Sequence, residues 1–160
     1  MNDGLNKEIA IYSDIELKLD YIREMGFNSI QFLPIQEFER NPSWGYNPAS
    51  YFSPESAHGT PEDLRRLVDK AHSKGLAIIF DVVCNHAGPG DNVLWQYDGY
   101  MKDGGIYFEG GQFTDWVRGP AWQKQEVQDF FFENAKMYFT DHSYGVYTDS
   151  QFGQWIRIFG

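Results

Sequence analysis

The sequence has few of the features that mark secreted or membrane proteins. It contains one cysteine, Cys84, so no disulfide can form within the chain, and a reducing compartment such as the cytoplasm is expected. No apolar run approaches the roughly 20 residues that a membrane-spanning helix needs, so no membrane is expected as a partner. The opening residues, "MNDGLNKEIAIYSD", lack the basic segment followed by an apolar one that is typical of a signal peptide.

Positive charge is also scarce. The 13 Lys and Arg residues are outnumbered by 23 Asp and Glu residues, which gives a formal net charge of −10 at pH 7. Nucleic acids and anionic membranes bind basic patches, so neither is expected as a partner. No internal repeat or low-complexity tract is visible, and 160 residues fit one compact domain.

Aromatic residues are abundant, at 18% of the chain. Most of the phenylalanines are expected to fill the core. Tyrosine and tryptophan in loops are different, because each combines an apolar body with a polar tip and so suits a wet binding cleft. Such side chains can also form platforms for the flat apolar faces of sugars.

The first helix is predicted over residues 13–27, "SDIELKLDYIREMGF". Ser13 is expected to cap it, with Glu16 completing a capping box, and Gly26 is expected to end it. The apolar stripe of this helix is Ile15, Leu19 and Ile22.

Two further helices are predicted over residues 60–75 and 125–143. The first of these has Thr60 as its cap, proline at the first helical position, Asp63 three residues after the cap, and Gly75 as its end. The apolar faces of the two helices are Leu64, Leu67, Val68 and Ala71, and then Val127, Phe131, Ala135 and Tyr138.

Three strands are predicted between the helices, over residues 28–35, 76–83 and 144–149. The continuous apolar run "LAIIFDVV" is typical of a strand that is buried on both faces, as in parallel sheets. Residues 41–59, rich in Pro, Gly, Ser and Asn, are predicted to be a long functional loop. Residues 87–124 are predicted to be an irregular excursion.

Helix and strand signals therefore alternate along the chain, which predicts an α/β fold with parallel strands. Two architectures fit this order: a doubly wound open sheet, or part of a (β/α)8 barrel. In both of them, ligands bind at the C-terminal ends of the strands. The residues at or after the three strand ends are Trp44, Tyr46 and Asn47; Asp81, Asn85 and His86; and Asp149.

The set "D-x-x-x-N-H" at the end of the central apolar strand indicates a functional site. A structural interpretation also exists for each member. Asp81 could bond loop amides, because a buried carboxylate needs hydrogen-bond partners. Asn85 could simply form a turn, and His86 could be a satisfied structural histidine.

The stretch "DVVCNH" resembles the first signature region of the α-amylase superfamily, glycoside hydrolase family 13. Residues 44–89, "WGYNP" to "NHAGP", are similar throughout to glucan branching enzymes and trehalohydrolases. Residues 105–138, "GIYFEGG" to "NAKMY", look most like the branching enzymes. The resemblance covers roughly residues 10–150.

The resemblance implies a fold and a substrate. The fold would be part of a (β/α)8 TIM barrel, about strands 2 to 4 with their helices. The substrate would be an α-glucan or a maltooligosaccharide, as in 1,4-α-glucan (glycogen) branching in carbohydrate metabolism. Cleavage would follow a retaining mechanism, which uses two carboxyl groups about 5 Å apart.

The resemblance also implies roles for individual residues. Tyr46 would stack under the sugar at the cleavage point, with Trp44 nearby as a further substrate-binding residue. His86 would bond a hydroxyl of that sugar. Asp81 would support the site, and Asp149 would be the nucleophile. A sixth residue, Asn85, matches a position that binds calcium in many amylases, and it also counts as a substrate-binding candidate; no other cofactor is expected.

The sequence departs from the family pattern at two points. The family's second region reads Gly-Phe-Arg-x-Asp, and here Tyr147 stands in place of the arginine whose charge would keep the nucleophile ionised. The family's general acid, a glutamate, lies on a later strand. Residues 1–160 are therefore expected to be a single partial catalytic domain, truncated before the later strands. It is expected to be inactive alone and to self-associate through exposed barrel edges.

Three alternatives stay open at this point. The first is a trehalohydrolase or an α-amylase-type hydrolase. The second is a non-catalytic glycan-binding module on the same scaffold, which the loss of the arginine favours. The third is a metal-dependent hydrolase with Asp81, Asn85 and His86 as ligands.

Overall fold

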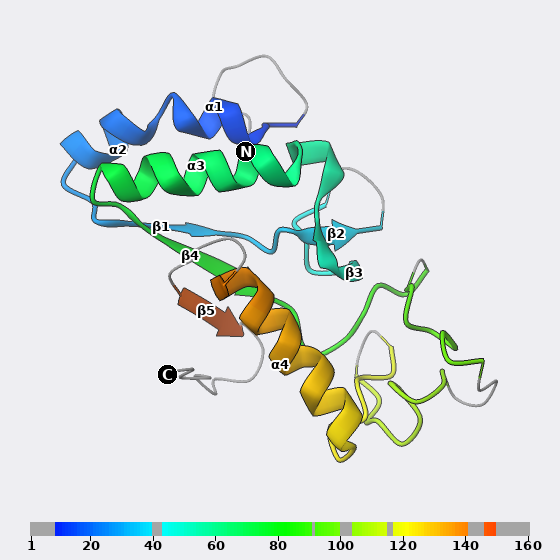
Figure 1. The fold of residues 1–160 in the computed structure, drawn as a ribbon. Coiled ribbons are helices and arrows are strands. Elements are labelled where there is room, and N and C mark those ends of the chain that lie inside the picture. Colours follow the sequence, from blue (N-terminus) through cyan, green and yellow to red (C-terminus); the bar gives the residue numbers. More distant parts are fainter. Residues whose placement is uncertain are drawn as a thin grey trace.

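The computed structural model describes residues 9–39, 43–90, 92–99, 104–114, 117–140 and 146–149, without the side chains of 139–140 and 146–149. Figure 1 shows the arrangement of the elements. In chain order these are α1 (Tyr12–Glu16), α2 (Leu19–Glu24), β1 (Ser29–Phe32), β2 (Gln36–Phe38), β3 (Pro48–Pro54), the 3-10 turn η1 (Ser56–His58), α3 (Pro61–Ser73), β4 (Ala77–Val82), α4 (Gln125–Thr140) and β5 (Val146–Asp149).

The main sheet has three parallel strands in the order β1-β4-β5. This arrangement confirms the predicted α/β fold with parallel crossovers. Helices α1, α2 and α3 lie together along one side of β1 and β4, and α4 connects the excursion to β5 (Figure 1). Within the described residues the sheet stays open, so the chain forms part of a barrel and not a closed one.

A second, two-stranded sheet corrects the predicted long loop over residues 41–59. Its middle forms β3, which pairs antiparallel with β2. Prolines and serines make this stretch a poor strand former by composition. Burial decides the outcome, since Tyr51 is only 1% exposed, and the two prolines stand at the strand ends, where proline is tolerated. The predicted strand over residues 28–35 is correspondingly shorter and ends at Phe32.

The first helix also differs from the prediction. It begins at Tyr12, so Ser13 lies inside the helix, and the Asp14 carboxylate accepts the hydrogen bond of the Ile11 N–H at 3.1 Å. Glu16 pairs with basic residues of α3 and takes no part in capping. The helix breaks before α2, and Gly26, with φ +90°, ends it as predicted.

The helix over residues 60–75 is confirmed. The Thr60 hydroxyl accepts a hydrogen bond from the Asp63 N–H at 3.2 Å, and the Asp63 carboxylate accepts one from the Thr60 N–H at 2.9 Å. These two bonds form a capping box. Gly75 ends the helix with φ +70°, a conformation that favours glycine.

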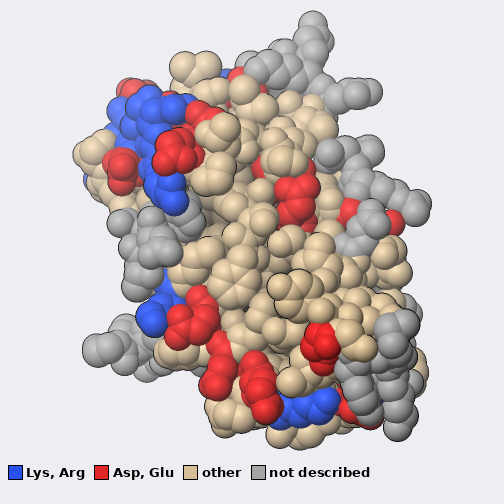
Figure 2. All heavy atoms as spheres, turned by 45° about the vertical axis from the view of Figure 1, so that its right-hand side comes forward, with Lys and Arg blue, Asp and Glu red and all other residues tan. Residues whose placement is uncertain are grey.

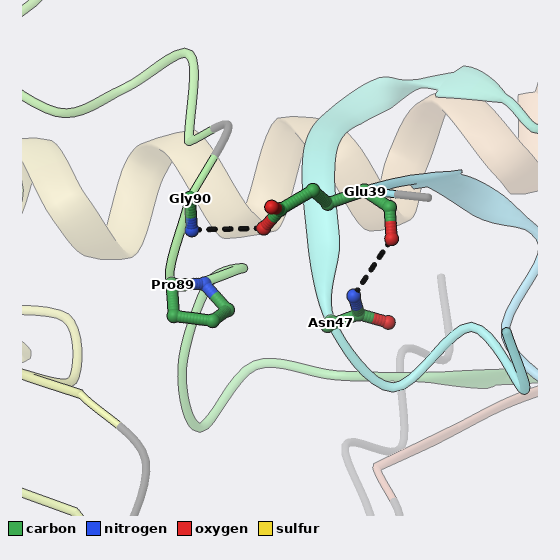
Figure 3. A pocket seen from close by; sticks show the side chains of 4 residues that line it. All are labelled: Glu39, Asn47, Pro89 and Gly90. Carbon is green, nitrogen blue, oxygen red and sulfur yellow. Dashed lines mark hydrogen bonds between the residues drawn. The ribbon is translucent and has the colours of Figure 1, made fainter. Parts of the chain in front are cut away.

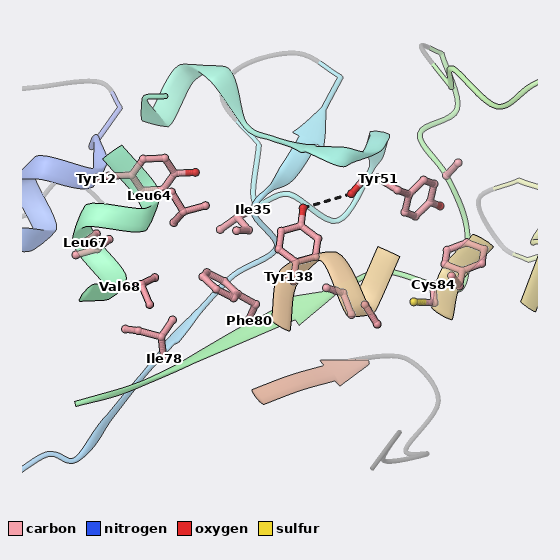
Figure 4. Close-up of a cluster of buried hydrophobic side chains, with 14 of the residues drawn as sticks. Tyr12, Ile35, Tyr51, Leu64, Leu67, Val68, Ile78, Phe80, Cys84 and Tyr138 are labelled. Atoms are coloured by element: carbon pink, nitrogen blue, oxygen red, sulfur yellow. Dashed lines mark hydrogen bonds between the residues drawn. The ribbon is translucent and has the colours of Figure 1, made fainter. Parts of the chain in front are cut away.

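The core fills the space between α3, the main sheet, the β2–β3 sheet and α4 (Figure 4). The predicted apolar faces of α3 and α4 are both buried in it. In β4, residues 80–82 are buried on both faces as predicted, whereas Ala77 is exposed. The labelled members include Tyr12, Ile35, Tyr51, Leu64, Leu67, Val68, Ile78, Phe80, Cys84 and Tyr138.

The described surface carries paired charges and groups of exposed apolar side chains. On the face drawn in Figure 2, Lys and Arg lie beside Asp and Glu. Near α1, α2 and β1, large apolar side chains are 55–77% exposed: Leu17, Tyr21, Met25, Phe27 and Leu33. Self-association through exposed barrel edges stays a prediction. In the described ranges, no helix has the length and apolar character to cross a membrane.

Candidate functional site

The candidate site lies where the parallel strands β4 and β5 end. The register pairs Val82 with Asp149 and Asp81 with Thr148. The backbone of Asp149 is therefore one residue nearer the C-terminal edge than Asp81, on the neighbouring strand. The side chain of Asp149 lies outside the described part, so its role as the nucleophile stays a prediction, as does any effect of Tyr147.

Asp81 and Tyr46 are in direct contact. The Tyr46 hydroxyl donates a hydrogen bond to Oδ2 of Asp81 at 2.7 Å, and Asp81 is 4% exposed. This bond, with burial and the nearby negative charge, raises the pKa of Tyr46 to about 12, since each favours the neutral phenol. The other carboxylate oxygen, Oδ1, is buried and has no hydrogen-bond partner among the described residues.

His86 is buried beside this pair. It is 4% exposed, its ring lies 3.2 Å from the amide nitrogen of Asn85, and it is hydrogen-bonded to the backbone of Tyr46. Burial lowers the pKa of His86, and the bond to Tyr46 opposes this effect only in part. The ring is therefore neutral at pH 7 and can exchange hydrogen bonds with an uncharged hydroxyl.

The loop that carries Tyr46 is held by close backbone packing. Gly45 has φ +86°, and a side chain there would meet the carbonyl oxygen of Pro34 at 2.1 Å. The Ser43 hydroxyl accepts a bond from the Gly45 N–H and donates one to Asn47. Trp44, in contrast, is 79% exposed, and its predicted part in substrate binding stays a prediction.

A contact that the sequence did not indicate joins the loop after β4 to the β2–β3 sheet. Glu39 accepts a hydrogen bond from the Gly90 N–H at 2.8 Å, while its own carbonyl accepts one from the amide of Asn47 (Figure 3). With Pro89, these residues line a cavity of about 320 Å³. The contact joins residues far apart in sequence, so no local pattern could have predicted it.

The described His, Cys, Asp and Glu side chains do not gather into a metal centre. No three His, Cys, Asp or Glu residues cluster as a ligand set in the described ranges. A calcium site takes about six to eight oxygen ligands, and Asn85 would supply one. The ligand set Asp81, Asn85 and His86 and calcium at Asn85 both stay predictions, and no step below depends on an ion.

Replacing Asp81 with leucine should raise the free energy of unfolding by about 0.5–2 kcal/mol. Leucine removes a buried carboxylate whose Oδ1 has no partner among the described residues, and the hydroxyl of half-buried Tyr46 can turn to water. Urea denaturation at pH 7 measures the change, with the exposed Asp69→Leu as control. If Asp81→Leu instead loses more stability than Asp69→Leu, the Asp81 carboxylate is well hydrogen-bonded in the folded protein.

Two kinds of enzyme are similar to this chain in sequence. Malto-oligosyltrehalose trehalohydrolase from Deinococcus radiodurans is 35% identical over 127 residues, which are 79% of this chain and 20% of that protein. The 1,4-α-glucan branching enzyme GlgB from Oleidesulfovibrio alaskensis is 34% identical over 134 residues, 82% of this chain and 21% of that protein. The chain thus spans about a fifth of the length of these relatives.

Solved structures show the same fold. An Anoxybacillus α-amylase superposes with a TM-score of 0.75 at 29% identity, over 87% of this chain and 33% of that one. The α-amylase from Geobacillus thermoleovorans, solved with acarbose, gives 0.75 at 26% identity, over 94% of this chain and 37% of that one. Residues 2–156 match the α-amylase catalytic domain, and the chain belongs to this family, as its first signature region predicted.

Proposed function

We propose that this chain is the nucleophile-bearing part of an enzyme that acts on α-1,4-glucans, with branching as the reaction. The observation that carries the proposal is the cluster at the end of β4, where the Tyr46 hydroxyl bonds buried Asp81 beside neutral His86. The backbone of Asp149 ends the adjacent strand. The buried thiol of Cys84 is consistent with the cytoplasm as the compartment.

The proposed chemistry begins with the Asp149 carboxylate. It attacks the anomeric carbon, the glycosidic C–O bond breaks, and a glycosyl ester forms on the protein. A second carboxylic acid must protonate the leaving oxygen, and the resemblance places that acid in a later part of the family's barrel. A sugar hydroxyl then takes the glycosyl group in branching, whereas water takes it in a trehalohydrolase or an amylase.

In this scheme the described residues bind and orient the substrate. The Tyr46 ring stacks under the sugar while its hydroxyl stays fixed on Asp81. Neutral His86 binds a sugar hydroxyl. The Tyr46 hydroxyl is held by Asp81 and the His86 ring by the backbone of Tyr46, and preorganised groups lose little entropy on binding.

A second candidate is a non-catalytic glycan-binding module. Two observations favour it: Tyr147 replaces the family's arginine, and Oδ1 of Asp81 has no described partner. The binding surface would be the same, but no glycosyl ester would form.

A glycosyl fluoride separates the two candidates, because fluoride leaves carbon without a general acid. The protein is incubated with α-maltosyl fluoride, digested and analysed by mass spectrometry. The expected result is one maltosyl group on the peptide that contains Asp149, and none in Asp149→Asn. The exposed Asp69→Asn serves as the matched control and should label normally.

Other outcomes assign the failure. Binding of maltooligosaccharide without any label would reject the catalytic proposal in favour of the binding module. A label that persists in Asp149→Asn would move the nucleophile to another residue. On amylose, the 160-residue chain alone should form no branches and release no reducing ends. The retaining mechanism needs two carboxyl groups, and in this proposal Asp149 supplies only the nucleophile.

A further inference from the structure

We infer that Tyr51 is a positioning residue, which holds the backbone of His86 and so sets where the His86 ring meets the substrate. The inference rests on the proposed function, in which His86 binds a sugar hydroxyl. Tyr51 lies in the buried strand β3, and its hydroxyl donates a hydrogen bond to the carbonyl oxygen of His86 at 3.0 Å. Tyr51 therefore acts on the site through His86 and not by touching the sugar.

His86 lies beyond the part of β4 that the main sheet holds. The strand ends at Val82, whose pairing with Asp149 is the last in the register of β4 with β5. No strand pairing is described for residues 83–90. The position of His86 therefore depends on individual hydrogen bonds and on packing.

The β2–β3 sheet and the residue after β2 support the loop of residues 86–90 at three points. The first is the bond from Tyr51 to the carbonyl of residue 86. At the second, the Gly88 N–H donates to the carbonyl of Pro48 at 2.6 Å. At the third, the Gly90 N–H donates to Glu39 at 2.8 Å. Of the three, only the Tyr51 bond acts on the residue whose ring is proposed to bind the sugar.

Tyr51 is itself fixed by α4. It is 1% exposed, and its ring packs edge-to-face on Phe131 with the centroids 5.0 Å apart. Its carbonyl accepts hydrogen bonds from the Asn134 amide at 2.7 Å and from the Tyr138 hydroxyl at 3.3 Å (Figure 4). Burial raises the pKa of Tyr51, so the hydroxyl keeps the proton that it donates. A donor that is held by its ring and by its own backbone can hold the atom that it bonds.

One short segment of the chain holds both proposed sugar contacts. The backbone of Tyr46 bonds the His86 ring, and Tyr51 bonds the His86 backbone. Residues 46–51 therefore keep Tyr46 and His86 at a fixed separation. Binding groups that become loose by about 1 Å lose much of their effect, so removal of the Tyr51 hydroxyl should reduce sugar affinity.

Tyr51→Phe tests the inference, because it keeps the buried ring and removes the donor. Calorimetric titration with maltoheptaose should show affinity weakened by about fivefold. Tyr138→Phe is the matched control, since it also removes a buried tyrosine hydroxyl from a backbone carbonyl, but from that of Tyr51. Both variants should lose similar stability in urea, and only Tyr51→Phe should lose affinity. The unnatural residue 4-aminophenylalanine at position 51 keeps a donor and should restore the affinity.

A measurement without sugar checks the contact by itself. The chain has four histidines, so the ring signals can be separated by NMR, and His86→Gln identifies the signal of His86. At one fixed pH, Tyr51→Phe should shift this signal, whereas Tyr138→Phe should leave it in place. In the wild-type protein, a nuclear Overhauser effect should join the Tyr51 hydroxyl proton to the backbone protons of residues 86 and 87.

Each other result has a defined meaning. Equal loss of affinity in Tyr51→Phe and Tyr138→Phe, or an unmoved His86 signal in Tyr51→Phe, would reduce Tyr51 to a structural residue and overturn the inference. If Tyr51→Phe does not fold, the absence of the Overhauser effect in the wild-type protein would overturn it. If the wild-type protein does not bind maltoheptaose, the proposed function fails, and the His86 signal still decides whether Tyr51 holds His86.

Discussion

Replacing Asn134 with leucine should lower the free energy of unfolding by about 2–4 kcal/mol. Asn134 is fully buried in α4 and bonds both strands of the β2–β3 sheet, which lie far from it in sequence. Its amide nitrogen donates to the carbonyl of Tyr51 at 2.7 Å, and its oxygen accepts from the amide of Gln36 at 3.4 Å. Leucine fills the space but leaves buried polar groups without these partners.

The loss at Gln36 makes the effect large. The amide oxygen of Gln36 is already buried with no hydrogen-bond partner among the described residues. The hydrogen bond from its amide nitrogen to Asn134 is therefore the described bond that holds this side chain, and leucine removes it. Urea denaturation gives the free energy, and Gln128→Leu is the control because it removes an exposed amide from the same helix. Equal stability of the two variants would show that the buried amides find other partners.

Replacing Tyr46 with alanine should weaken maltooligosaccharide binding by at least about tenfold, the loss expected when a central aromatic contact is removed. Tyr46→Phe separates the ring from the hydroxyl. The phenylalanine should keep much of the affinity but lose about 1–3 kcal/mol of stability, because Asp81 is then left with neither oxygen bonded to a described group. Calorimetric titration and urea denaturation measure the two effects.

The pH dependence of stability gives a separate readout for the same bond. The pKa of Tyr46 is raised from 10.0 to about 12, so its contribution is complete below pH 10 and is lost as the pH rises towards 12. Tyr46→Phe has no such group to titrate, so it should lose less stability than the wild-type protein between pH 10 and pH 12. Tyr97→Phe, at a 77% exposed tyrosine, should behave as the wild-type protein. Identical alkaline profiles for all three proteins would contradict the bond.

Sequence reasoning succeeded where local chemistry decides the structure. The capping box at Thr60, the glycine at residue 75 and the apolar period of α3 act within a few residues of one another, so the helix could be predicted in full. The apolar run around Asp81 likewise indicated a parallel strand before any partner strand was known.

It failed where distant residues decide. The strand β3 exists because Tyr51 is buried against the aromatic residues of α4, which its own composition does not reveal. Tyr46 and Asp81 were both singled out, but their hydrogen bond depends on the path of the intervening loop. The contacts of Glu39 and Asn134 span still longer separations and leave no periodic pattern.

The order of strands in the main sheet also sets the order in which it can form. A short hairpin and α3 separate β1 from β4, whereas the whole excursion and α4 separate β4 from β5. Closing a longer loop costs more chain entropy, and pairings between distant residues form more slowly. We therefore expect the β1–α3–β4 unit to form first. We expect the pairing of β4 with β5, which carries Asp149, to form later.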